Sequence, residues 1–159
     1  MKTLCLGCMK EYEGDYNVCP HCGYEQTSPA KEAYHIAPGV TIRGRYVVGR
    51  VLGFGGFGIT YIGFDTTLQH RVAIKEYFPS EFATRMPHET LVRVYAGERK
   101  EQFVAGMKKS LDEAKRLAEF HQVPGITQIY DFFEENNTAY IVMELLEGET
   151  LKARLKKVG

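Results

Sequence analysis

The pattern of apolar and polar positions divides the chain into an irregular N-terminal stretch and a regular remainder that begins near residue 42. The regular part opens with three short runs rich in β-branched and aromatic residues, separated by turn-forming residues. This pattern predicts strands over residues 45–52, 59–64 and 71–77. A similar run predicts an additional strand over residues 90–95, inside a long connection.

The period then changes from that of a strand to that of a helix. Between residues 98 and 120, apolar side chains recur every three or four positions, at Phe103, Met107, Leu111, Ala114, Leu117 and Ala118. Residues 129–134 and 139–146 predict a hairpin, and residues 150–157 predict the beginning of another helix. This order predicts an α+β fold with a mostly antiparallel five-stranded sheet and one long helix.

Composition and charge narrow the class of protein. The 159 residues are 44% hydrophobic and 25% charged, which is typical of a globular protein, and 20 basic residues balance 20 acidic ones. Zero net charge gives no reason to expect nucleic acid or an anionic membrane as the main partner. No apolar run is long enough to span a membrane or to serve as a secretory signal. We therefore expect a cytoplasmic protein with no membrane segment in this chain.

All the cysteines lie in the first 22 residues, as two C-x2-C pairs: Cys5, Cys8, Cys19 and Cys22. Two such pairs can supply the four thiolates of a closed tetrahedral site, so the spacing predicts a zinc ribbon over residues 1–25 with a structural Zn²⁺. Thiolate-bound iron and free or disulfide-bonded thiols are the alternatives. Residues 26–41 have the composition of a linker, and residues 42–159 then form a second domain.

A glycine-rich segment lies between the first two predicted strands of that second domain. Gly53, Gly55 and Gly58 form a G-x-G-x-x-G pattern, but a strand follows it rather than the helix of a dinucleotide fold. Glycines in such a loop let backbone N–H groups approach phosphate oxygens, although a plain glycine-rich hairpin has the same pattern. The sequence Val-Ala-Ile-Lys at residues 72–75, on the next predicted strand, favours the phosphate-binding interpretation.

Because the glycine-rich motif and the Val-Ala-Ile-Lys motif follow each other in this order, residues 45–159 resemble the small lobe of a eukaryotic-type protein kinase. The amino-acid sequence around Lys75 resembles that of bacterial Ser/Thr kinases. The resemblance implies ATP with Mg²⁺ as the ligand. It also implies that Lys75 contacts the α- and β-phosphates and that Glu113 on the helix pairs with Lys75, although a solvated glutamate is the alternative for Glu113. The other nucleotide contacts that it implies are Leu52, Gly53, Gly55, Gly56, Phe57, Gly58, Thr60, Ala73, the gatekeeper Met143, and the hinge residues Glu144 and Leu146.

The sequence departs from the kinase pattern in three places. Thr60 stands where the family usually has Val, the connection over residues 76–99 is longer than usual, and residues 121–126 match the family only loosely. The catalytic loop and the D-F-G motif of the large lobe do not occur within the 159 residues. We therefore expect the chain alone to be inactive, and we expect the complete protein to bind protein substrates through its large lobe.

Two other classes of function remain open at this stage. The complete protein could be a pseudokinase or scaffold whose zinc ribbon docks onto another protein. A nucleic-acid-binding ribbon is disfavoured, because Lys2 and Lys10 are its only basic residues, against the acidic residues Glu11, Glu13 and Asp15, so it attracts phosphate poorly. We expect a protein partner for the ribbon instead. Electron transfer by a thiolate-bound iron is a further alternative.

Overall fold

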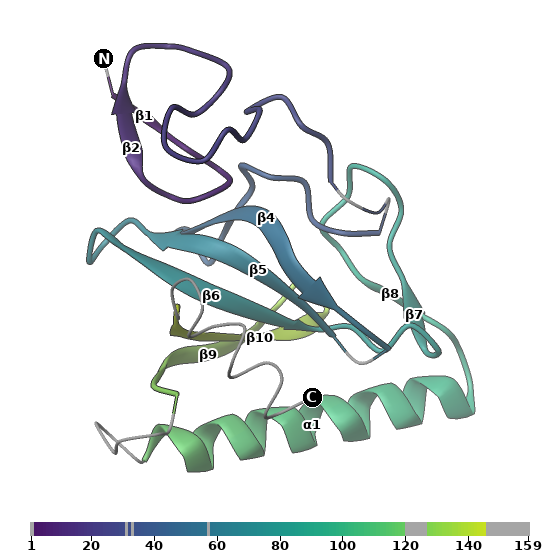
Figure 1. The fold of residues 1–159 in the computed structure, drawn as a ribbon. Helices are drawn as coiled ribbons and strands as arrows, with labels where there is room; N and C mark the ends of the chain where they lie inside the picture. The colour runs from purple at the N-terminus through teal and green to yellow at the C-terminus, as the bar shows by residue number, and fades with distance from the viewer. Residues whose placement is uncertain (1, 31, 33, 57, 120–126, 146–159) are drawn as a thin grey trace.

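The computed structural model describes residues 2–30, 32, 34–56, 58–119 and 127–145. These residues form three layers, which Figure 1 shows from top to bottom. A small N-terminal unit lies at the edge of a central sheet, and one long helix lies on the other side of that sheet. The predicted α+β class is confirmed.

The central sheet has six strands in the order β3-β4-β5-β6-β10-β9, and every neighbouring pair is antiparallel. Five of its strands were predicted to within two residues at each end. The sixth, β3, pairs with the start of β4 and is too short to leave a pattern in the sequence. The strands are β3 (Thr41–Ile42), β4 (Tyr46–Phe54), β5 (Gly58–Asp65), β6 (His70–Tyr77), β9 (Ile129–Glu135) and β10 (Thr138–Glu144).

The hairpin between β9 and β10 turns at Asn136 and Asn137, as predicted. Both residues have positive φ angles, 55° and 63°. A tight hairpin turn of this hand needs positive φ at both central positions, and Asn tolerates that conformation better than most residues. The predicted end of the second strand at Leu146 lies outside the described residues, as does the predicted helix over 150–157.

The long helix α1 (Glu98–Ala118) follows the predicted helical pattern. Phe103 and Ala114 of the apolar stripe are buried, whereas Leu117 is 38% exposed at the edge of the stripe. The predicted end at Phe120 lies outside the described residues. Within the described ranges, no helix is long and apolar enough to cross a membrane.

The long connection over residues 76–99 carries its own small hairpin. β7 (Ala83–Thr84) pairs with β8 (Arg93–Val94), so the strand predicted over residues 90–95 is confirmed at only two positions. β7 was not predicted, because two residues cannot show a period. Val92, next to β8, is 1% exposed and belongs to the main core. The connection is therefore packed against the sheet.

The N-terminal unit is a hairpin followed by a loop. β1 (Lys2–Leu4) pairs with β2 (Glu11–Glu13), and one bridge joins Val18 to Glu25. Its small core consists of Tyr12 and two of the cysteines, with Tyr24 packed against them. Such a core is too small to stabilise a domain by itself, which fits a unit that folds around a metal.

The segment with a linker composition, residues 26–41, makes specific contacts over its second half. His35 and Ile36 are 2% and 1% exposed, and Ile36 belongs to the same core as Val48 and Tyr61. The backbone N–H of Ile36 donates to the Tyr61 hydroxyl at 3.0 Å. This half of the segment thus covers one face of the sheet. The domain limits at residues 25 and 42 stay a prediction.

Candidate nucleotide site and metal centre

One face of the central sheet carries four of the predicted nucleotide contacts. Thr60 lies opposite Lys75 in the antiparallel register, and Ala73 lies opposite Met143. Directly opposed residues share a face, and residues two apart on one strand share it as well. The structure therefore brings Thr60, Ala73, Lys75 and Met143 from three strands onto one face. Their role in binding a nucleotide stays a prediction.

The glycine-rich hairpin between β4 and β5 lies at the end of this face. A Cβ atom added at Gly53, Gly55 or Gly56 would meet no atom of the described residues within 4 Å. Packing within this part of the chain therefore does not require glycine at these positions, whereas the close approach of a ligand would. Gly58 differs from these glycines, because a Cβ atom added at Gly58 would lie 2.9 Å from the carbonyl oxygen of Glu76. Its absent side chain lets β5 approach β6.

Lys75 and Glu113 line the same cavity between the sheet and α1, which has a volume of about 320 Å³. Lys109 also lines it, so the cavity has two cationic groups and one carboxylate on its walls. Lys75 and Glu113 are both exposed, and in the described part of the chain no ion pair joins them within 4.0 Å. The structure thus places the predicted pair in one cavity but does not show it joined.

The position of α1 relative to Lys75 is fixed by a contact two residues further along β6. The Tyr77 hydroxyl donates to the carbonyl oxygen of Phe103 at 3.0 Å, and the two rings lie 5.1 Å apart. A Cβ added at Gly106 would lie 2.2 Å from the same hydroxyl oxygen. Gly106 therefore permits the close approach of α1, the helix that carries Glu113, to the strand that carries Lys75.

The remaining predicted contacts lie around the edges of the site. Leu52 is half-buried on β4, next to the glycine-rich hairpin. Glu144 ends β10, where its backbone N–H donates to the carbonyl oxygen of Gln128 at 2.9 Å. Phe57 and Leu146 lie outside the described residues.

Sequence reasoning missed a buried charged group next to Lys75. Glu76 points to the opposite face of the sheet, where it forms an ion pair with Arg85 of the long connection, and both side chains are 0% exposed. The hydroxyls of Tyr61 and Tyr140 also donate to the Glu76 carboxylate, at 3.0 and 2.7 Å. The available signal was the strand period, which places Glu76 on the same face as the buried Ile74.

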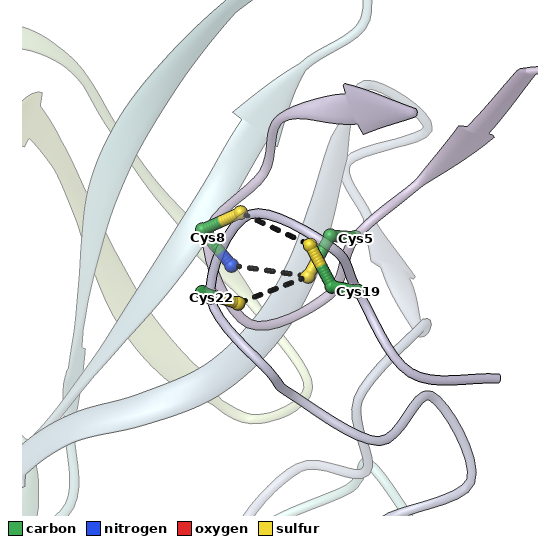
Figure 2. A group of neighbouring side chains, drawn as sticks. All are labelled: Cys5, Cys8, Cys19 and Cys22. Carbon is green, nitrogen blue, oxygen red and sulfur yellow. Dashed lines mark hydrogen bonds between the residues drawn. The ribbon is translucent and has the colours of Figure 1, made fainter. Parts of the chain in front are cut away.

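The four cysteines of the N-terminal unit converge on one point, as Figure 2 shows. All four sulfur atoms lie within 4.8 Å of one another. The Sγ atoms of Cys5 and Cys22 are 3.6 Å apart, and those of Cys8 and Cys19 are 3.9 Å apart. A tetrahedron of sulfurs about 2.3 Å from a central Zn²⁺ has edges of about 3.8 Å. The donor set and its spacing therefore fit a tetrahedral thiolate site.

The two C-x2-C turns, or knuckles, have the same backbone conformation. In the first knuckle, residues 5–10, the N–H of Met9 donates to the carbonyl oxygen of Cys5 at 2.8 Å. In the second knuckle, residues 19–24, the N–H of Gly23 donates to the carbonyl oxygen of Cys19 at 2.8 Å. Met9 and Gly23 have φ angles of 60° and 79°. Glycine adopts this conformation freely, whereas Met at the same position is strained by about 1 kcal/mol.

Burial and hydrogen bonds act in opposite directions on the thiols. Burial raises the pKa of Cys5 to about 12 and also raises the pKa of Cys8. Burial acts on Cys19 as well, but backbone N–H groups of Cys22 and His21 donate to its sulfur and lower its pKa to about 7. N–H groups directed at sulfur are the donors that stabilise a thiolate, the form in which a cysteine can bind a metal.

Comparison with known proteins gives close matches over the lobe. No family model matches the chain. Over 126 residues, covering 76% of the chain, it is 36% identical to the Ser/Thr-protein kinase PknA of Mycobacterium tuberculosis, and it is 35% identical over 122 residues to the Ser/Thr-protein kinase PrkC of Bacillus subtilis. A solved structure, the PpkA-294 apo form, matches 76% of the chain with a TM-score of 0.67 and 31% identity.

The chain belongs to the bacterial Ser/Thr protein kinases, of which it carries the small lobe. It spans 25% of the length of PknA, 16% of PrkC and 43% of the PpkA-294 chain. The resemblance seen in the glycine-rich loop and the Val-Ala-Ile-Lys strand is thereby confirmed, together with the fold of the kinase lobe. The four-cysteine unit precedes that lobe.

Proposed function

We propose that the kinase lobe binds ATP with Mg²⁺ and that the complete protein transfers the γ-phosphoryl group of ATP to Ser or Thr hydroxyls of protein substrates. One observation carries the proposal: Ala73 and Lys75 share a sheet face with Thr60, beside glycines whose missing side chains leave open space. An apolar face for the base and a cation near a glycine-rich loop for the phosphates are the elements that a kinase small lobe supplies.

The arrangement of Lys75 and Glu113 supports the same function. Both groups line one cavity without forming an ion pair in the described part of the chain. In kinases the pairing of these two side chains depends on the position of the helix, which is a point of control. We propose that nucleotide and the large lobe bring the pair together. The same lobe would supply the catalytic base and the Mg²⁺ ligands, so phosphoryl transfer is proposed only for a chain that includes it.

The test is nucleotide binding by this chain, measured by titration with a fluorescent ATP analogue in the presence of Mg²⁺. We expect weak binding, because the lobe forms only one side of the cleft, and Lys75→Met should reduce the affinity at least tenfold. Lys100→Met, on the exposed first turn of α1, is the matched control and should leave the affinity unchanged. Equal affinities of the wild type and Lys75→Met would contradict the proposed site.

We further propose that the four cysteines hold a structural Zn²⁺, for which the sulfur spacing is the support. Four thiolates close the coordination shell, so the ion would fold and fix the unit rather than take part in a reaction. Metal analysis of protein purified without added metal should give one zinc per chain. A visible absorption band from freshly purified protein would indicate iron instead.

A non-catalytic function is the second candidate, since Lys75 and Glu113 are not joined in the described residues. In that case the complete protein would be a pseudokinase or scaffold, and the cysteine unit would dock onto a protein partner. Phosphorylation of a generic protein substrate by the complete protein, lost on Lys75→Met, would decide for the kinase. We place either function in the cytoplasm, where ATP is available and thiols stay reduced.

A further inference from the structure

The first knuckle of the cysteine unit is hydrogen-bonded to Arg50 of strand β4 in the kinase lobe. The backbone N–H of Arg50 donates to the carbonyl oxygen of Leu6 at 2.9 Å. The Nε–H of the Arg50 side chain donates to the carbonyl oxygen of Gly7 at 2.6 Å. Both acceptors lie between the first two cysteines, in the turn that shapes the metal site.

The same two peptide groups also bond to the sulfur of Cys5 on their other side. The N–H of Gly7, in the peptide whose carbonyl belongs to Leu6, donates to the Cys5 Sγ at 3.2 Å. The N–H of Cys8, in the peptide whose carbonyl belongs to Gly7, donates to it at 3.4 Å, a bond drawn in Figure 2. Two peptide planes therefore connect one ligand sulfur with Arg50.

Metal bound to Cys5 would strengthen this connection. A metal-bound thiolate is a strong, charged acceptor, whereas a neutral thiol is a weak one. Hydrogen bonds that share a peptide group strengthen one another, because each polarises the group for the other. A metal bound to Cys5 therefore holds the carbonyl groups of Leu6 and Gly7 in the direction of Arg50. Removal of the metal weakens the hydrogen bonds from Arg50 to these two carbonyl groups.

The first knuckle also packs directly on β4. Met9 is 2% exposed, and a Cβ atom added at Gly49 would lie 2.5 Å from its Cε atom and 2.2 Å from the Leu6 oxygen. Only a residue without a side chain leaves room for the knuckle at position 49. Met9 has the positive φ angle for which the second knuckle has Gly23, so the first knuckle tolerates a strained residue whose side chain packs on β4.

The contact lies at an irregular point of β4. Val48 opposes Gly63 and Val51 opposes Tyr61, so two residues of β4, Gly49 and Arg50, oppose the single residue Ile62. Such a bulge disrupts the ladder locally and leaves its extra residue without a ladder partner, so contacts from outside the sheet can stabilise the strand there. Three residues beyond Arg50, the chain enters the glycine-rich hairpin at Gly53.

We propose that the first knuckle is a metal-dependent support for the bulge of β4, so that metal loading sets the order of the strand that leads into the glycine-rich hairpin. The proposal rests on the metal site proposed above. Arg50 and Met9 are its positioning residues, since neither is a metal ligand and both join the knuckle to the lobe. The site would thus act on the kinase lobe as well as on its own unit.

The test is amide hydrogen exchange of the 159-residue chain, read by mass spectrometry, with and without one equivalent of Zn²⁺. We expect zinc to slow exchange over residues 46–54 by roughly tenfold, the effect of restoring one or two hydrogen bonds. Peptides from β9 and β10 serve as the internal reference and should change by less than about twofold. Zinc content is measured on the same samples.

Two variants separate support of β4 from metal binding. Met9→Gly removes the packed side chain and the strain together, and Arg50→Ala removes one of the two bonds to the knuckle. Both should still bind one zinc per chain but lose most of the protection that zinc gives to β4. Arg93→Ala, an exposed arginine of β8, is the matched control and should behave like the wild type.

The outcomes distinguish this inference from the metal site on which it rests. One zinc per chain with unchanged exchange of β4 would overturn the inference alone. Full protection of β4 in both Met9→Gly and Arg50→Ala would overturn it as well, because the support would not pass through these residues. A chain that binds no divalent metal would overturn the metal site and the inference together.

Discussion

Arg85 and Glu76 form an ion pair that is closed off from water, one residue along β6 from Lys75. The contact joins the guanidinium to both carboxylate oxygens. Two tyrosine hydroxyls donate to the same carboxylate, and Arg85 also donates to the carbonyl oxygens of Tyr34 and Thr90, at 2.9 and 3.1 Å. The segment that contains Tyr34, the long connection and the strands β5, β6 and β10 therefore meet at one buried charge pair.

Removal of one partner of this pair should be strongly destabilising. Glu76→Ala leaves the Arg85 guanidinium buried with no counter-charge, a change that typically costs about 3–5 kcal/mol in the free energy of unfolding. Urea denaturation followed by circular dichroism measures the loss. Glu89→Ala, which breaks the exposed pair with Arg93, is the control and should cost less than about 1 kcal/mol. Similar losses in the two variants would contradict the assigned role of the buried pair.

A second prediction concerns Gly106 in the middle of α1. Ala is a better helix former than Gly by about 1 kcal/mol, so Gly106→Ala would stabilise an isolated helix. In this lobe the new Cβ would lie 2.2 Å from the Tyr77 hydroxyl oxygen, which donates to Phe103. We expect Gly106→Ala to lower the melting temperature, because this hydrogen bond must break.

The double variant Tyr77→Phe, Gly106→Ala separates the two effects. Without the hydroxyl the clash is absent, so adding Gly106→Ala to Tyr77→Phe should be neutral or stabilising. Thermal denaturation of the four proteins in the cycle measures the coupling between the two positions. Independent, additive effects would mean that Tyr77 does not hold α1 at this distance.

The long regular elements of this fold could be predicted, because each shows its period over seven or more residues. The short strands could not: β3 and β7 have two residues each, and only their partners β4 and β8 define them. The composition of residues 26–41 suggested a linker, but Ile36 is buried in the core with Val48 and Tyr61, and its backbone N–H donates to the Tyr61 hydroxyl of a distant strand. Local sequence contains no sign of such long-range contacts.

The features of the candidate sites could likewise be predicted only where they are local in the sequence. The spacing of Cys5 and its three partners, and the Val-Ala-Ile-Lys strand, are short local patterns from which metal-binding and nucleotide-binding residues can be predicted. The partners of Glu76 and the contacts of Arg50 with the first knuckle are set by tertiary structure alone. A pattern can show that Glu76 lies on the buried face of its strand, but it cannot show which arginine neutralises it.

Asp65 provides a prediction on acid stability. The Arg45 guanidinium, which donates two hydrogen bonds of 2.8 and 2.7 Å, holds the pKa of this buried carboxyl below its ordinary value. Because the folded-state pKa is lowered, the carboxylate stabilises the fold above the unfolded pKa of about 3.9, and this stabilisation is lost as pH falls through the folded-state value. Asp65→Asn should therefore be less stable than the wild type at pH 7, and the difference should shrink below about pH 4.

Urea denaturation of both proteins between pH 3 and 7 measures this dependence, with the pH points set roughly one unit apart on either side of the ordinary Asp pKa. Glu89→Gln, which neutralises an exposed carboxylate, is the control and should show little change in its difference from the wild type. A constant difference between Asp65→Asn and the wild type across the range would mean that the Asp65 charge does not contribute.

The last prediction concerns competition between protons and metal at the cysteine site. Burial raises the pKa of Cys5 to about 12 and also raises that of Cys8, so both thiols carry protons at neutral pH when no metal is bound. Zinc binds thiolates, so each binding event must release at least these two protons. Low pH therefore weakens binding, and the affinity should rise by at least about a hundredfold per pH unit near neutrality.

Titration against a chelator of known zinc affinity, at several pH values around neutrality, gives the slope of log affinity against pH, and calorimetry in two buffers counts the released protons. His21 lies between two ligands but is exposed, with its ring against the carbonyl oxygen of Glu11. His21→Ala should therefore keep both the affinity and the slope. A slope below about one in the wild type would show that the thiols are already ionised before the metal arrives, and the N–H groups directed at sulfur would then outweigh burial.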